Sequence, residues 1–65
     1  MNTEPTANIL IVDDDPKTLL AMEALLSGPG RNTVTASSGQ EALRWLLRQD
    51  FSVILMDVRM PDMDG

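Results

Sequence analysis

Apolar residues follow two patterns along this chain, consecutive in some segments and three or four positions apart in others. Residues 8–12 and 53–56 are apolar at nearly every position, which is typical of strands covered on both faces in a parallel sheet. Residues 31–36 mix polar and β-branched side chains, so we expect a strand at a sheet edge. With helical patterns between these segments, the sequence predicts the order β-α-β-α-β, with parallel strands joined by right-handed crossovers.

The first predicted helix has signals at both ends. Asp15 is suited to the N-cap and Pro16 to the first helical position. After the helix, we expect Gly28 to take a left-handed conformation that Pro29 cannot continue. The apolar stripe of this helix comprises Leu19, Leu20, Met22, Leu25 and Leu26.

The second predicted helix begins with a capping box, with Ser38 at the N-cap and Glu41 three positions later. Trp45 lies on the flank of the apolar stripe, where packing is a simpler interpretation than contact with a partner. We also expect Met56, in the third strand, to be a core residue. The residues expected to be buried on this helix are Ala42, Leu43, Leu46 and Leu47.

The composition limits the class of protein. A length of 65 residues allows one domain with a small core. Because the chain has no Cys and no His, it can form no disulfide, no zinc site and no imidazole-based catalytic site. No apolar run exceeds four residues, which argues against a membrane span. We expect a cytoplasmic protein with residues 1–7 as a disordered arm.

The negative charge is concentrated in two places. The chain has 10 acidic and 5 basic residues, for a net charge of −5. Six of the acids lie in two clusters, Asp13, Asp14 and Asp15 in one and Asp57, Asp62 and Asp64 in the other. Outside these clusters the bases slightly outnumber the acids, and an acidic chain of this kind is not expected to bind nucleic acid directly.

Each acidic cluster directly follows a predicted strand. In parallel sheets, ligands bind beyond the carboxyl ends of the strands. If the first and third strands are neighbours, Asp13, Asp14 and Asp57 converge there. Two unit charges 4 Å apart repel by roughly 4 kcal/mol at an effective dielectric constant of 20. Such a cluster therefore calls for a cation, and Mg²⁺ suits a few carboxylate oxygens completed by water and phosphate.

Three segments of this chain closely resemble response-regulator receiver domains. They are residues 9–16 (ILIVDDDP), 35–43 (TASSGQEAL) and 54–65 (ILMDVRMPDMDG). The resemblance runs without a gap from residue 8 to residue 65 and implies a flavodoxin-like, doubly wound parallel α/β sheet. Only the first β-α-β-α-β portion of that sheet would be present here.

The resemblance also implies a function and a set of site residues. Asp57 matches the aspartate that accepts a phosphoryl group from the phosphohistidine of a histidine kinase or a phosphotransfer protein. Asp14 matches the acid that binds Mg²⁺ directly, and Asp13 its neighbour, which acts through water. Arg59 matches the position whose backbone carbonyl ligates the metal, and Gly65 the glycine that ends the loop after the acceptor. The domain would be a signalling module rather than an enzyme, assisting its own phosphorylation and dephosphorylation when complete.

The family pattern continues beyond Gly65 with a Ser or Thr and a Lys that contact the phosphoryl group. We therefore expect residues 8–65 to be the N-terminal half of a receiver, with an output domain or partner that the sequence does not identify. The unpaired edge of the third strand leaves open self-association.

Two other functions stay open at this point. One is a receiver-like interaction module that is not phosphorylated. The other, weaker one is an aspartyl-nucleophile phosphatase, for which Asp13 and Asp15 fit but Lys17 stands where Thr or Val is expected.

Overall fold

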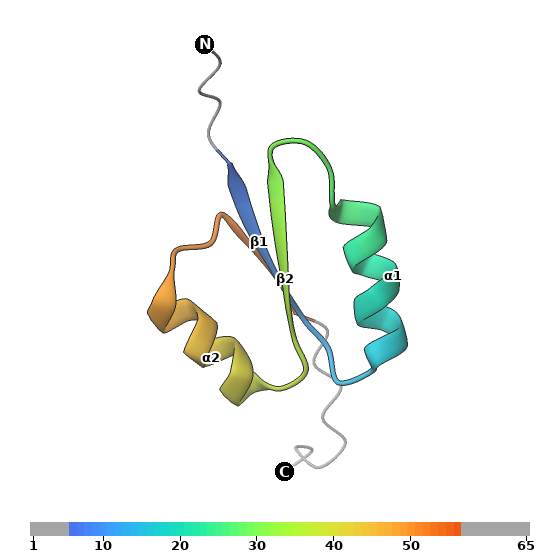
Figure 1. Ribbon diagram of the computed structural model, residues 1–65. Helices are drawn as coiled ribbons and strands as arrows, with labels where there is room; N and C mark the ends of the chain where they lie inside the picture. Colours follow the sequence, from blue (N-terminus) through green and yellow to red (C-terminus); the bar gives the residue numbers. More distant parts are fainter. Residues whose placement is uncertain (1–5, 57–65) are drawn as a thin grey trace.

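The computed structural model describes residues 6–56, a three-stranded parallel sheet with one helix on each face (Figure 1). The elements are β1 (Ala7–Val12), α1 (Pro16–Leu26), β2 (Arg31–Ala36), α2 (Gly39–Arg48) and β3 (Val53–Met56). The strand order is β2-β1-β3, which confirms the predicted β-α-β-α-β portion of a flavodoxin-like sheet and the place of β2 at an edge. Residues 1–5 of the predicted arm, and Asp57, Arg59 and Gly65 of the predicted site, lie outside the described residues.

The core lies on both faces of β1, the central strand. Leu10 and Ile11 are fully buried and point to opposite faces. On the α2 side the buried cluster is Leu10, Val12, Ala36 and Ala42, and on the α1 side it is Ile9, Ile11 and Leu19. Burying a leucine or isoleucine side chain contributes about 1.5–3 kcal/mol, so β1 supplies much of the stabilisation of this small fold.

The start of α1 forms as its sequence predicts, with Asp15 accepting a hydrogen bond from the backbone N–H of Lys17 at 3.0 Å and Pro16 beginning the helix. The prediction for Gly28 is wrong. The positive φ, 75°, belongs to Gly30 instead. The N–H of Arg31 donates to the carbonyl of Gly28 at 3.1 Å. This closes a four-residue turn with Pro29 and Gly30 at its centre, the arrangement in which a type II turn needs glycine at the third position.

The start of α2 differs in one bond from the predicted capping box. The hydroxyl of Ser38 accepts from the backbone N–H of Glu41 at 3.1 Å, as predicted. The Glu41 carboxylate, however, accepts from the backbone N–H and the hydroxyl of Ser37, at 2.8 and 2.9 Å, rather than from the N–H of Ser38. The reciprocal bond is thus formed one residue further out.

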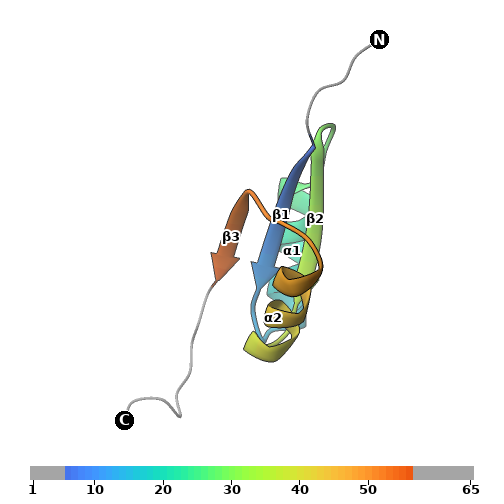
Figure 2. The ribbon, with the colours of Figure 1, turned by 90° about the vertical axis from the view of Figure 1, so that its left-hand side faces the viewer.

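The predicted apolar faces of both helices are too wide. Leu20 and Leu25 of α1 are exposed, and so are Leu43, Leu46 and Leu47 of α2. Ala42 is buried as predicted, and Trp45 packs against the core cluster, which confirms packing for this side chain. The reason is that the backbones of α1 and α2 lie against β1 and β2 and not against β3 (Figure 2). Only a narrow stripe of each helix therefore meets the sheet.

β3 is not covered in the way that its apolar sequence predicts. Leu55 is partly buried against the α1-side cluster, but Val53, Ile54 and Met56 are exposed. The prediction of Met56 as a core residue is therefore wrong. Neither helix within residues 6–56 has the length and hydrophobicity needed to span a bilayer.

Candidate functional site

The candidate site lies at the carboxyl ends of β1 and β3. These strands are parallel neighbours, with Val12 opposite Met56 at their ends. Asp13 follows β1 directly, and Asp57 follows β3 in the sequence. The condition on which the predicted site depends, that the first and third strands adjoin, is therefore met. The position of the Asp57 side chain lies outside the described residues.

Asp13 is held firmly at the end of β1. Its backbone N–H donates to the carbonyl of Ala36 at 3.1 Å and extends the pairing of β1 with β2. Its side chain is only 5% exposed, and Oδ1 accepts a hydrogen bond from the backbone N–H of Asp15 at 2.8 Å. Burying a carboxylate is costly unless its oxygens are hydrogen-bonded, and this bond offsets part of that cost.

Asp15 serves the helix rather than the site. One carboxylate oxygen caps α1 through the N–H of Lys17, and the other accepts from the hydroxyl of Thr18 at 3.4 Å. Asp14, between these two residues, is exposed, and its side chain makes no hydrogen bond to the described residues. Of the three consecutive acids, Asp14 is thus the one whose carboxylate is open to a ligand from solvent.

These residues fit part of a magnesium site. Asp13 and Asp14 supply hard oxygen donors, which Mg²⁺ prefers, and they lie on a loop that leads into the N-terminus of α1. Within residues 6–56, no group of three or more acidic, Cys or His side chains is close enough to hold a metal ion. The other predicted ligands, Asp57 and the carbonyl of Arg59, lie outside this range.

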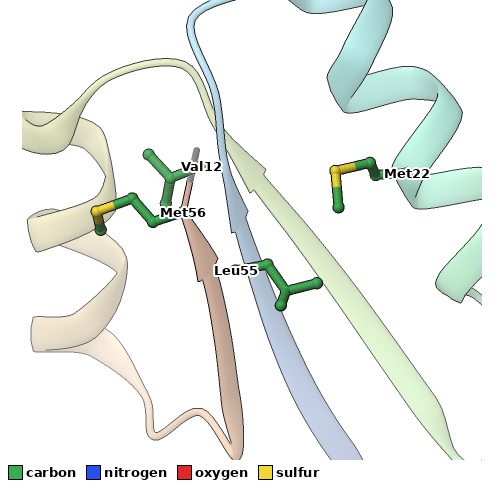
Figure 3. Close-up of a pocket in the computed structure, with 4 residues that line it drawn as sticks. All are labelled: Val12, Met22, Leu55 and Met56. Carbon is green, nitrogen blue, oxygen red and sulfur yellow. The ribbon is translucent and has the colours of Figure 1, made fainter. Parts of the chain in front are cut away.

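Sequence reasoning missed two features of this region. The first is the side-chain-to-backbone hydrogen bond from the N–H of Asp15 to the carboxylate of Asp13. The signal for this bond was available, because Asp commonly bonds the backbone two residues on in Asx-turns. The second is an apolar pocket beside the site, for which no local sequence pattern gives a signal (Figure 3). Its lining residues are Val12, Met22, Leu55 and Met56.

Residues 9–65 match the family of response regulator receiver domains, and the chain belongs to this family. It is 44% identical over 63 residues to the transcriptional regulatory protein ZraR of Escherichia coli K12, covering 97% of this chain and 14% of ZraR. It is also 44% identical over 59 residues to GlrR of the same organism, covering 91% of this chain and 13% of GlrR. To the sensor protein GacS of Pseudomonas syringae it is 40% identical over 57 residues, covering 88% of this chain and 6% of GacS.

The chain therefore spans at most about a seventh of the length of these relatives. No solved structure matches the chain significantly. The match shows that this is the receiver segment of a two-component signalling family, and it confirms the resemblance found in the sequence.

Proposed function

We propose that this chain is a phosphoacceptor in a two-component phosphorelay, with Asp57 as the residue that becomes phosphorylated. The donor would be the phosphohistidine of a histidine kinase or of a phosphotransfer protein. The observation that carries the proposal is the parallel pairing of β1 with β3, because it brings the strand before Asp57 beside the strand before Asp13. The family match supports the same role.

In this proposal the carboxylate of Asp57 attacks phosphorus. An oxygen–phosphorus bond forms and the phosphorus–nitrogen bond to the donor breaks. The electron pair of the broken bond stays on the departing nitrogen, and the imidazole leaves neutral because its other ring nitrogen already carries a proton. The product is an acyl phosphate on Asp57. A carboxylate is already ionised near neutral pH, so the step needs no general base.

Asp13, Asp14, Asp57 and the carbonyl of Arg59 would hold Mg²⁺, with Asp13 acting through water. When bound, the ion supplies positive charge that stabilises the phosphoryl oxygens during transfer. Asp14 is suited to direct ligation because it is exposed, whereas Asp13 is buried and already holds the N–H of Asp15. This difference agrees with a direct role for Asp14 and an indirect one for Asp13.

Phosphorylation would act as a switch. It adds negative charge and new acceptor oxygens at the end of the sheet, which shifts a conformational equilibrium that an output domain or partner reads. The matched relatives are named as transcriptional regulators and as a sensor protein, so their names indicate no common output for this chain. The proposal is confined to the phosphoacceptor step.

The test is to incubate the chain with acetyl phosphate and Mg²⁺ and to detect a phosphoryl group by intact mass. We expect labelling of the unaltered chain, its loss in Asp57→Asn, and its retention in Asp62→Asn, which removes the same charge a few residues away. Asp14→Asn should weaken both magnesium binding and labelling.

Labelling that persists in Asp57→Asn would contradict the acceptor assignment. A folded chain that binds Mg²⁺ but takes no phosphoryl group would favour the unphosphorylated interaction module. Hydrolysis of a simple phosphate ester with rapid turnover would instead favour the phosphatase alternative.

A further inference from the structure

The carboxylate of Glu41 bonds a peptide group that also bonds Asp13. Its Oε1 accepts the backbone N–H of Ser37 at 2.8 Å. This N–H belongs to the peptide that links Ala36 to Ser37, and the C=O of the same peptide accepts the N–H of Asp13 at 3.1 Å. The N–H and C=O of a trans peptide point in opposite directions. The peptide is therefore held from both sides, by Glu41 of α2 and by Asp13 after β1.

This peptide lies beside the candidate site. The connection from β1 to α1 and the connection from β2 to α2 leave the sheet at the same end (Figure 1). Ala36 and Asp13 are both buried, so water has little access to the bond between them. A hydrogen bond is electrostatically stronger in such surroundings than in water. The contact is thus suited to fix the backbone at the start of the acidic cluster.

Helix capping alone does not account for the contact of Glu41. In a capping box the Glu bonds the backbone N–H of the N-cap residue, which here is Ser38. Glu41 instead bonds Ser37, through both its N–H and its hydroxyl. Ser38 caps α2 independently, through its own hydroxyl. The Glu41 carboxylate therefore holds the peptide that Asp13 bonds rather than the N-cap residue.

The charge of Glu41 also strengthens the bond on the far side of the peptide. The two bonds from Ser37 hold the pKa of Glu41 below its ordinary value, so the carboxylate is ionised at neutral pH. A charged acceptor polarises the peptide that donates to it, and the C=O of a polarised peptide is a better acceptor in turn. Glu41 thus acts on the N–H of Asp13 through a single peptide group.

We propose that Glu41 is a positioning residue for the magnesium site, because it holds Asp13 through the peptide between them. Oδ1 of Asp13 accepts the N–H of Asp15, so the backbone of Asp13 and the loop that carries Asp14 are fixed together. The proposal rests on the magnesium site of the proposed function and adds to it a residue that lies on another element, outside both acidic clusters.

Two substitutions of Glu41 distinguish its hydrogen bonds from its charge. Glu41→Gln keeps an oxygen acceptor and removes the charge, whereas Glu41→Ala removes both. Because the two variants lose the same charge, its through-space effect on Mg²⁺ is the same in each. Glu23→Gln is the matched control, since Glu23 lies on α1 and its side chain makes no hydrogen bond to the residues that the structure describes.

Amide hydrogen exchange of the chain, followed by NMR, measures the contact directly and needs neither metal nor phosphoryl donor. The amide of Ile11, in the buried middle of β1, serves as the internal reference. We expect the Asp13 amide of Glu41→Ala to exchange about threefold or more faster relative to Ile11, and that of Glu41→Gln by a smaller factor. A loss of overall stability alone would not raise this ratio.

Calorimetric titration of Mg²⁺ gives the second readout. Glu41→Ala should bind Mg²⁺ about threefold or more weakly than Glu41→Gln, less than the usual cost of losing a direct support of a metal ligand, because Asp13 acts through water. Glu23→Gln should change neither the exchange ratio nor the affinity.

An unchanged exchange ratio in Glu41→Ala would overturn the proposal. Equal magnesium affinities of Glu41→Gln and Glu41→Ala, or an effect of Glu23→Gln as large as that of Glu41→Gln, would also overturn it. Failure of the proposed function gives a different result. If the unaltered chain bound Mg²⁺ but took no phosphoryl group, the phosphoacceptor role alone would be contradicted, and the exchange ratio would still decide the role of Glu41.

Discussion

Two substitutions of Asp13 distinguish the effect of its hydrogen bond from the effect of its negative charge. Its Oδ1 accepts the N–H of Asp15 at 2.8 Å, and the side chain is 5% exposed. Asp13→Asn keeps an oxygen at this position and removes the charge, whereas Asp13→Ala removes both. The two variants lose the same charge, so the difference between them isolates the hydrogen bond from any change in repulsion with Asp14 and Asp15.

The size of the difference follows from that bond. Leaving a partly buried N–H without its acceptor costs about 1–2 kcal/mol in the free energy of unfolding. A chain of 65 residues has a total stability of roughly 3–10 kcal/mol, so the loss is a large share of it. Each kcal/mol lowers the melting temperature of a domain this small by roughly 4–8 °C. We expect the melting temperature of Asp13→Ala to be lower than that of Asp13→Asn, by roughly 4–8 °C for each kcal/mol that the hydrogen bond contributes.

The assay combines thermal unfolding, followed by circular dichroism, with calorimetric titration of Mg²⁺. Melting temperature should distinguish the two variants, but magnesium affinity should not, since both lack the carboxylate. Equal melting temperatures would refute the structural role of the bond. Retained magnesium affinity in Asp13→Asn would refute the role of its charge in the metal site.

Two further predictions concern the core and pH. Leu10→Ala should lower the free energy of unfolding by about 2–5 kcal/mol, because Leu10 is fully buried, while Leu20→Ala on the exposed side of α1 should change it by less than about 0.5 kcal/mol in denaturant titrations. The backbone N–H and hydroxyl of Ser37 hold the pKa of Glu41 below its ordinary value. This stabilisation is complete above the ordinary carboxyl pKa and is lost as pH falls through the lowered one, so Glu41→Gln should reduce the fall in melting temperature on acidification.

The strands were the easiest elements to predict. The predicted range 31–36 agrees with β2, and 53–56 with β3. β1 begins at Ala7, one residue earlier than expected. Uninterrupted apolar runs have few other structures available in a short chain, and the Asp that follows each run marks the end of the strand. The same local signals predicted that the acids would follow the first and third strands. That these strands are neighbours was only a condition of the predicted site, and the pairing of β1 with β3 meets it.

Burial was harder to predict because it depends on which elements lie opposite each other. Leu25 and Leu26 are chemically identical neighbours, yet Leu26 packs against the core and Leu25 is exposed. Periodicity identifies the apolar side of α1. How much of that side is buried depends on the sheet, and the helices lie over β1 and β2 but not over β3. The same reason explains why Met56 is exposed despite its place in an apolar strand.

The three consecutive acids after β1 show how one short segment can both fold and carry a site. Asp15 bonds the first turn of α1, where negative charge is favoured by the helix dipole. Asp13 bonds the N–H of Asp15 and thereby fixes the path of the loop between strand and helix. These bonds fix the residues on both sides of Asp14, whose carboxylate is exposed. A ligand there meets a preorganised group, so less conformational entropy is lost on binding than in a free loop.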